Sequence, residues 1–253
     1  MNAGWMGRIL WVDLTDHKIW TEQPDDRFYT DFLGTYGIGA RLLYSRMPAG
    51  ADPLGPQNIL GLTTGPVART PLPCTSRFVA VAKSPLTLTW GDANSGGHFG
   101  MALKGAGFDA VFISGVSHKP LYLCVNDGRA ELRPAEHLWG LDAAQTDDVL
   151  KAECDVPGVQ VACIGPAGER LSRISGIVTD KGRIAARSGL GAVMGSKRLK
   201  AVVVAGRAKV GLHDAHRVDE LRQRILGVIR DPDNLRMASV QTYGTAGGMV
   251  GAI

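Results

Sequence analysis

The stretch "SGLGAVMGSK" at residues 188–197 decides how this chain is interpreted, because "SGGHFGMALK" at residues 95–104 looks like a second copy of it. In each copy, small residues open a short helical segment and a lysine closes it. Small residues at the start of a helix let an anion approach the backbone N–H groups. Both stretches therefore predict a phosphate-binding site.

The segments around these two Ser-Gly loops repeat in the same order. Each half begins with a predicted β-hairpin, at residues 8–23 with a turn at 15–17, and at residues 121–135 with a turn at 126–128. A helix, a strand ending in a Gly-Pro turn, a strand headed by an arginine, the Ser-Gly helix and a last strand then follow. They lie at residues 38–47, 58–68, 76–84, 95–104 and 109–115, and again at residues 142–153, 159–168, 172–180, 188–197 and 200–206.

This repeat predicts an α+β fold that is internally duplicated, with mixed β-sheets completed by both halves around a pseudo-two-fold axis. The halves span about residues 7–115 and 119–206 of a base domain at residues 1–210. Residues 211–253 are expected to begin a second, helical domain that is truncated, opening with an amphipathic helix at residues 217–230. Whatever one Ser-Gly loop binds, the other should bind on the opposite side of the axis.

Composition narrows the class of ligand. The 253 residues include 28 Lys and Arg against 24 Asp and Glu, and this mild excess of positive charge is spread along the chain. It suits an anionic ligand, and the lack of basic runs interleaved with aromatic residues argues against nucleic acid as a partner. With no charged-then-apolar leader and no apolar run near the ~20 residues of a membrane helix, the sequence predicts a cytoplasmic protein without a membrane partner.

The four cysteines, Cys74, Cys124, Cys154 and Cys163, show no CxxC or CxxxC spacing. They predict neither a disulfide framework nor a zinc or iron–sulfur site built from sequence neighbours. Cys124 and Cys163 lie inside apolar runs, which is typical of small core residues.

Two familiar phosphate loops fit less well. A dinucleotide fingerprint requires a buried strand before its glycines, whereas residues 180–187 are too polar for that strand. A P-loop requires Gly-Lys-Ser/Thr, whereas residues 195–197 read Gly-Ser-Lys. A structural explanation is that these glycines only permit tight packing, but the duplication weakens that explanation. A nucleotide-binding enzyme is a more distant functional alternative.

Three arginines are candidates for binding an anion. Arg77, Arg183 and Arg187 could each add a permanently charged, bidentate contact, although surface ion pairs are an equal alternative. Asn94 precedes the first Ser-Gly loop, where it could cap the following helix. His98 lies within that loop and is expected to face solvent.

Taken together, the motifs resemble the N-terminal domain of the tungsten-containing aldehyde:ferredoxin oxidoreductases. The resemblance runs from about Gly4 to about Gly206. It rests on "DPLGPQN" (52–58), "TGP" (64–66), "SRF" (76–78), "KSPLT" (83–87), "ANSGG" (93–97), "HLWG" (137–140), "IGPAGE" (164–169) and "SGLGAVMGSKRLKAV" (188–202). The combination is specific, although no single motif would be.

The resemblance implies a base on which two molybdopterin-type dithiolene cofactors lie, one on each side of the axis, and together chelate tungsten. Matched by motif, Arg77 lies between a pterin and an iron–sulfur cluster, Asn94 at a magnesium-binding backbone carbonyl, and Gly96 at a pterin contact. The segment with the equivalent implied role in cofactor binding in the second half contains Arg183, Ile184, Ala186 and Arg187. The carbonyls of Asn94 and Ile184 are implied to bind a Mg²⁺ that joins the two pterin phosphates.

Three segments depart from the family pattern. Residues 34–37 read Gly-Thr-Tyr-Gly where the family usually has Gly-Gly-Arg-Gly, so an arginine contact there is missing. Cys74 and Ser76 stand where glycines are common, close to the implied cofactor face. The residues after Arg183 read Ile-Ala-Ala-Arg-Ser instead of a pattern nearer Ala-Ala-Gly-Arg-Gly. These changes affect the fine geometry of the cofactor site and leave the fold as expected.

The implied reaction oxidises an aldehyde to a carboxylic acid and passes electrons through a 4Fe-4S cluster to ferredoxin or another electron-carrier subunit. The cluster and the acid–base residues are expected in domains beyond this chain, so no catalytic residue is assigned, and a homo-oligomer is left open. Two alternatives remain. One is a stand-alone cofactor-binding scaffold that needs a partner subunit, and the other is the base of a related tungsten reductase acting on an aromatic thioester.

Overall fold

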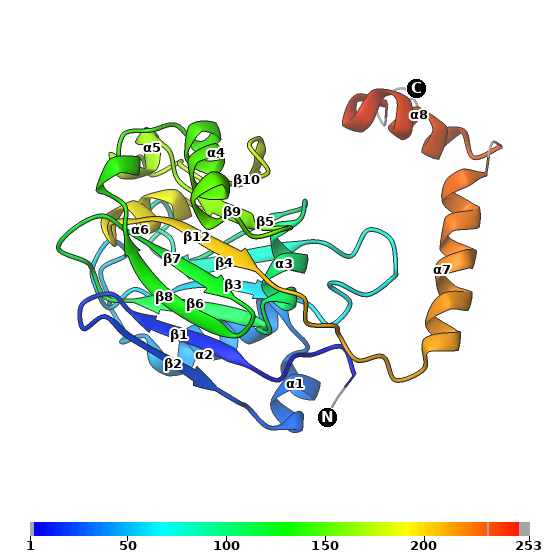
Figure 1. Cartoon of the computed structure of the whole chain (residues 1–253), viewed down its shortest axis with the longest axis horizontal. Helices are drawn as coiled ribbons and strands as arrows, with labels where there is room; N and C mark the ends of the chain where they lie inside the picture. Colours follow the sequence, from blue (N-terminus) through cyan, green and yellow to red (C-terminus); the bar gives the residue numbers. More distant parts are fainter. Residues whose placement is uncertain (1–2, 232, 248–253) are drawn as a thin grey trace.

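Two six-stranded mixed sheets form the body of the chain in the computed structural model, which describes residues 3–231 and 233–247 (Figure 1). The first sheet has the order β2-β1-β6-β3-β4-β5, and the second, taken from its opposite edge, has the order β8-β7-β12-β9-β10-β11. The first contains β1 (Ile9–Asp13), β2 (Lys18–Glu22), β3 (Leu60–Thr64), β4 (Phe78–Lys83), β5 (Trp90–Ser95) and β6 (Ala110–Ser114). The second contains β7 (Leu121–Asn126), β8 (Arg129–Pro134), β9 (Gln160–Cys163), β10 (Ile177–Thr179), β11 (Arg183–Ala185) and β12 (Leu199–Ala205).

The two sheets have the same connectivity, which confirms the predicted duplicated α+β fold. The prediction that both halves complete each sheet is wrong, because all six strands of each sheet come from one half and the halves meet through their helices and edge strands. In the first sheet β1 runs parallel to β6 and every other neighbouring pair is antiparallel. In the second sheet β7 runs parallel to β12, and again every other pair is antiparallel. Both hairpins form as predicted. In the second, Asp127 (φ 42°) and Gly128 (φ 82°) take the two positive φ angles of a type I′ turn.

Most of the helices lie on the two outer faces of the sheets and between the sheets, and the two C-terminal helices lie apart from them. They are α1 (Asp26–Phe32), α2 (Thr35–Arg46), α3 (Phe99–Gly105), α4 (Ala143–Cys154), α5 (Pro166–Glu169), α6 (Leu190–Ser196), α7 (Ala215–Arg230) and α8 (Leu235–Tyr243), with short 3-10 turns at Glu136–Leu138 and Gly244–Ala246. Helices α1 and α2 contribute Tyr29, Ile38 and Leu42 to a core on the outer face of the first sheet. Helix α4 contributes Leu150 to the corresponding core on the second sheet.

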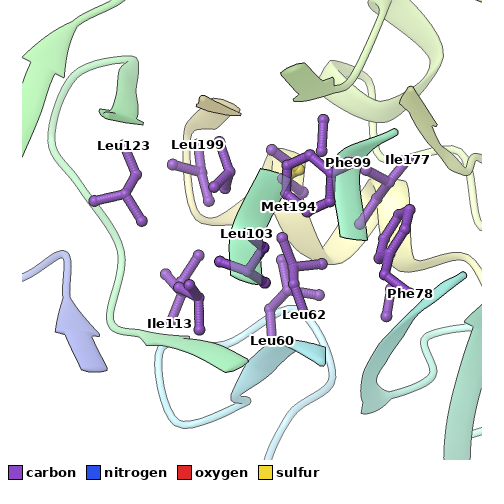
Figure 2. Close-up of a cluster of buried hydrophobic side chains, with 14 of the residues drawn as sticks. Leu60, Leu62, Phe78, Phe99, Leu103, Ile113, Leu123, Ile177, Met194 and Leu199 are labelled. Carbon is purple, nitrogen blue, oxygen red and sulfur yellow. The ribbon is translucent and has the colours of Figure 1, made fainter. Parts of the chain in front are cut away.

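Helices α3 and α6 lie between the two sheets. Phe99 and Leu103 of α3 share a buried cluster with Met194 of α6, with Leu62 of the first sheet and with Leu123 of the second (Figure 2). Each helix also crosses the axis, because α3 contacts β9 and β12 of the second half, whereas α6 contacts β3, β4 and β5 of the first. The central core is therefore shared by both halves.

Two strands were not predicted from the sequence. Both β5 and β11 are edge strands, and β11 falls in residues 180–187, which look too polar for a strand. The strand forms there because an edge position leaves Arg183 and Ile184 exposed and buries only Ala185. It is antiparallel to β10 and mostly exposed, so it is not the buried parallel strand of a dinucleotide-binding loop.

The C-terminal segment extends away from the sheets (Figure 1). Helix α7 begins where the Asp214 side chain accepts a hydrogen bond from the N–H of Arg217, and it buries no residue. The predicted helix at residues 217–230 is thus confirmed, while residues 248–253 of the expected second domain lie outside the described residues. None of the helices in the described ranges has the length and apolar character needed to cross a membrane.

Candidate functional site

The equivalent edge strands β5 and β11 lie against each other, and their contact therefore marks the pseudo-two-fold axis. A cavity of about 500 Å³ opens between them. It is lined by Asp92, Ala93, Asn94, Ile184, Ala186 and Arg187. Four of the residues singled out from the sequence thus share one cavity, although 90 positions separate the two strands that carry Asn94 and Ile184.

A hydrogen-bonded chain of three side chains continues this cavity on the first half. The Nη1 group of Arg77 donates to Oδ1 of Asn94 at 2.5 Å, and Nδ2 of Asn94 donates to the hydroxyl of Tyr36 at 2.9 Å. All three side chains are exposed. Because Asn94 uses one of the five N–H donors of Arg77, this contact orients the guanidinium and leaves its other donors for a ligand.

The structure corrects the helix-capping role considered for Asn94. Asn94 lies within β5, opposite Val79, whereas α3 begins only after His98. Its side chain points instead to Arg77 and Tyr36. Tyr36 occupies the position of the missing arginine, and the sequence signalled it only as a departure from the family pattern.

Gly96 and Arg183 come together from opposite halves. A Cβ atom at Gly96 would meet, within 4 Å, Nη1 of Arg183 at 3.5 Å, so the space beside this glycine is otherwise open. Next to it, Gly97 has φ +95°, and a Cβ atom there would lie 1.8 Å from Oδ2 of Asp180. The first Ser-Gly loop therefore packs directly against the turn between β10 and β11.

Asp180 holds this loop in place. Its Oδ2 accepts a hydrogen bond from the backbone N–H of His98 at 3.0 Å, and its Oδ1 lies 3.3 Å from Nδ1 of the same residue. The His98 ring remains largely exposed, as expected. Asp180 also lies 3.9 Å from Nε of Arg183, so its charge partly offsets that guanidinium. No local signal in the sequence identifies Asp180, because its partner His98 lies 82 positions away.

The second Ser-Gly loop is held by the first half in return. The Ser84 hydroxyl donates to the carbonyl of Ser188 at 2.8 Å, and the Ser188 hydroxyl donates to the carbonyl of Asp92. A Cβ atom at Gly189, which has φ +70°, would lie 3.1 Å from Cγ of Pro85 of the first half. The loops are therefore clamped across the axis by reciprocal contacts.

These contacts use one N–H group near the start of each Ser-Gly helix, where the sequence predicted open N–H groups that bind the phosphates. At the first loop the N–H of His98 already donates to Asp180, and at the second the N–H of Gly191 donates to the carbonyl of Ser175 at 3.1 Å. Helix α6 is almost wholly buried, and buried N–H groups require internal partners. The guanidinium groups of Arg77, Arg183 and Arg187 are exposed, so they could also attract an anion.

Comparison with known proteins decides the family. Residues 9–206 match the family described as "Aldehyde ferredoxin oxidoreductase, N-terminal domain". The chain belongs to the aldehyde ferredoxin oxidoreductase family. It is 41% identical over 244 residues to the tungsten-containing aldehyde ferredoxin oxidoreductase of Pyrococcus abyssi, covering 96% of this chain and 40% of that protein. The enzyme of the same name from Thermococcus kodakarensis is 40% identical over 247 residues, covering 97% of this chain and 40% of that protein.

A solved structure in the same fold extends the comparison. The active site complex BamBC of benzoyl coenzyme A reductase, in complex with 1,5-dienoyl-CoA, matches with a TM-score of 0.89 and 34% identity. The match covers 92% of this chain and 36% of that one. The present chain spans about 40% of the length of its curated relatives, and it matches the N-terminal domain of the family.

Proposed function

We propose that residues 1–210 form the base that binds a tungsten bis-pterin cofactor in an oxidoreductase that converts aldehydes to carboxylic acids. Residues 211–253 begin the helical second domain of that enzyme. The observation that carries the proposal is the cavity at the pseudo-two-fold axis, flanked by arginines from both halves of a chain whose relatives are tungsten enzymes.

The residues at this cavity fit such a cofactor. Space is open beside Gly96, and the exposed arginines come from both sides of the axis, which suits a ligand with two similar anionic groups. In this proposal Arg77, Asn94 and Gly96 would hold one pterin, and the backbone carbonyls of Asn94 and Ile184 would bind a Mg²⁺. The other pterin is served by Arg183, Ile184, Ala186 and Arg187.

The chain's own residues have a binding and orienting role. When bound, the cofactor supplies the two-electron chemistry. Arg77 offers a permanent positive charge whose direction is set by Asn94, and Asp180 keeps the loop that carries Gly96 fixed against the second half. Acid–base groups, the 4Fe-4S cluster, and ferredoxin or another electron-carrier subunit complete the proposed enzyme from beyond this chain.

A second candidate function is the base of a tungsten reductase that acts on an aromatic thioester. The observation that favours it is the TM-score of 0.89 with a benzoyl coenzyme A reductase complex. That structure is also named as a complex, so a cofactor-binding scaffold that works with a partner subunit remains a related alternative. Activity assays with aldehydes and with aromatic thioesters, on the protein purified with its partners, would separate these functions.

Arg77→Ala tests the cofactor-binding proposal. The chain is produced with tungstate, and bound tungsten and released pterin are quantified per chain. Because Arg77 is exposed and its proposed role is a charged contact, we expect about a tenfold or greater loss of cofactor with an unchanged circular dichroism spectrum. Arg27→Ala, which removes an exposed arginine of α1 paired with Asp31, is the control and should keep the wild-type cofactor content. A wild-type chain without tungsten and pterin, or an Arg77→Ala chain with full content, would contradict the proposal.

A further inference from the structure

A second cavity, of about 400 Å³, opens on the outer face of the second sheet. Cys124 of β7, Arg133 of β8 and Cys154, the last residue of α4, are among its lining residues. Strands β7 and β8 form the edge of the sheet opposite β11, so this cavity is separate from the cavity at the pseudo-two-fold axis. The proposed cofactor function makes no use of it.

Cys124 and Cys154 approach each other at this cavity although no short motif links them. Both side chains line the cavity and belong to one apolar cluster on the outer face of the second sheet, and both cysteines are free. Cys124 is 9% exposed and Cys154 is half-buried, so the cavity provides the route to the sulfur atoms. No group of three or more His, Cys, Asp or Glu residues with metal-binding geometry occurs in the described ranges.

The surroundings give the two thiols different roles. The hydrogen bond from Cys154 lowers the pKa of the Cys124 thiol below its usual value, and the nearby Arg133 guanidinium acts in the same direction against the effect of burial. Donation of that hydrogen bond raises the pKa of the Cys154 thiol. A thiolate is the attacking species in thiol chemistry. Arg133 lines the same cavity on β8, beside the β7 strand that carries Cys124, and its positive charge favours a thiolate there, so we assign Cys124 as the nucleophile of the pair and Cys154 as its neighbouring thiol.

The other two cysteines provide a contrast within the same chain. Cys163 is buried, its thiol faces the carbonyl of Ala143 at 3.5 Å, and burial raises its pKa to about 12. Cys74 is exposed on the loop that precedes Arg77. Among the four cysteines, therefore, Cys124 and Cys154 are the two that line a common cavity.

We propose that Cys124 and Cys154 form a thiol–disulfide exchange site that reacts reversibly with small disulfides entering this cavity. The Cys124 thiolate attacks one sulfur of the small disulfide, the S–S bond breaks, and one small thiolate leaves. Cys154 then loses its proton and attacks the Cys124 sulfur, which releases the second small thiolate. Two protein thiols are oxidised to one disulfide while the small disulfide is reduced to two thiols.

This bridge would join the end of α4 to the edge of the second sheet. The mixed disulfide of the first step removes the Cys124 thiolate, and the hydrogen bond that keeps Cys154 protonated is lost with it. Cys154 is therefore released to react in the second step. A cross-link between positions 124 and 154 also restricts the unfolded chain, so the oxidised protein should melt at a higher temperature than the reduced one.

The test uses oxidised glutathione as the probe. The reduced 253-residue chain is incubated with it, free thiols are alkylated, and peptides are mapped by mass spectrometry. We expect a peptide pair linked through Cys124 and Cys154 that has lost two hydrogen atoms. In Cys154→Ser we expect glutathione to stay attached to Cys124. Cys163→Ser is the matched control and should form the linked pair as the wild type does.

Two results would overturn the proposal. One is alkylation of both Cys124 and Cys154 after treatment, with glutathione found at Cys74 alone. The other is a wild-type chain in which glutathione remains on Cys124, because Cys154 would then not resolve the mixed disulfide. The melting temperatures of reduced and oxidised wild-type chain provide an independent readout, and equal values would count against a bridge between α4 and β7.

Discussion

Three fully buried lysines differ in how their charge is compensated. Lys104 forms an ion pair with Asp109 at 2.9 Å, and Lys200 forms one with Glu169 at 2.5 Å. Lys197 holds the position equivalent to Lys104 in the second half, where it donates to the carbonyl of Gly115 at 3.1 Å. Within the described residues no carboxylate lies at ion-pair distance from Lys197, and burial lowers its pKa to about 7.

Lys197→Met should make stability less dependent on pH. The pKa of Lys197 is lower in the folded chain than in the unfolded chain, so between about pH 7 and pH 10 the unfolded state binds more protons. The stability of the wild type should therefore rise with pH across this window. The methionine variant should lose most of this slope and gain on the order of a few kcal/mol at neutral pH.

Urea unfolding at several pH values measures both effects. Lys181→Met is the control, because Lys181 is exposed and pairs with Asp148 on the surface. The control should keep the wild-type slope between pH 7 and pH 10. An unchanged slope in Lys197→Met would show that Lys197 stays charged in the folded chain.

At the scale of elements, the turn between β10 and β11 fixes the start of α3 through Asp180. Gly97 allows this contact, since its φ of +95° is unfavourable for other residues and its Cβ position coincides with the Asp180 carboxylate. Gly97→Ala should therefore displace the turn and cost about 1–3 kcal/mol of the free energy of unfolding. Denaturant unfolding measures this loss.

Gly182→Ala is the matched control for Gly97→Ala. Gly182 lies in the same turn, and a Cβ atom there would meet nothing within 4 Å. Its substitution should change the free energy of unfolding by less than about 1 kcal/mol. Equal losses in the two variants would indicate that the cost of Gly97→Ala does not come from its contact with Asp180.

At the scale of the whole molecule, the two halves depend on each other for their core. Helix α3 packs on the strands of the second half and α6 on those of the first, and one buried cluster includes both sheets. Contacts from Lys197 to Gly115 and from Arg198 to His118 add to this connection. A half produced alone would lose the contacts that the helix of the other half makes with the inner face of its sheet.

Chains of residues 1–118 and 119–213 should therefore fail to fold separately, although each contains a complete set of strands for one sheet. Circular dichroism and urea titration would show each half without a cooperative transition, because it cannot bury its inner apolar surface. The chain of residues 1–213 should unfold in one transition, since α7 buries no residue against the sheets. A cooperative transition in residues 119–213 alone would contradict the shared core.

The sequence by itself determined the order of the elements, the duplication and the family. Apolar strands, Gly-Pro turns and Ser-Gly helices are local patterns, and each half carries them in the same order. The burial of Cys124 and Cys163 also followed from the apolar runs around them. These features could be predicted because burial of a regular element leaves a periodic signal in its own residues.

Only the tertiary structure decided how the candidate site is assembled. The edge strand β11 has only three residues and is mostly exposed, and β5 buries only the small residues Gly91, Ala93 and Ser95, so neither strand carries a strong hydrophobic pattern. The contact of Asn94 with Tyr36 spans 58 positions, and that of His98 with Asp180 spans 82. Such contacts follow from sheet order and from the packing of one half on the other, which place distant side chains together without any local signal in the sequence.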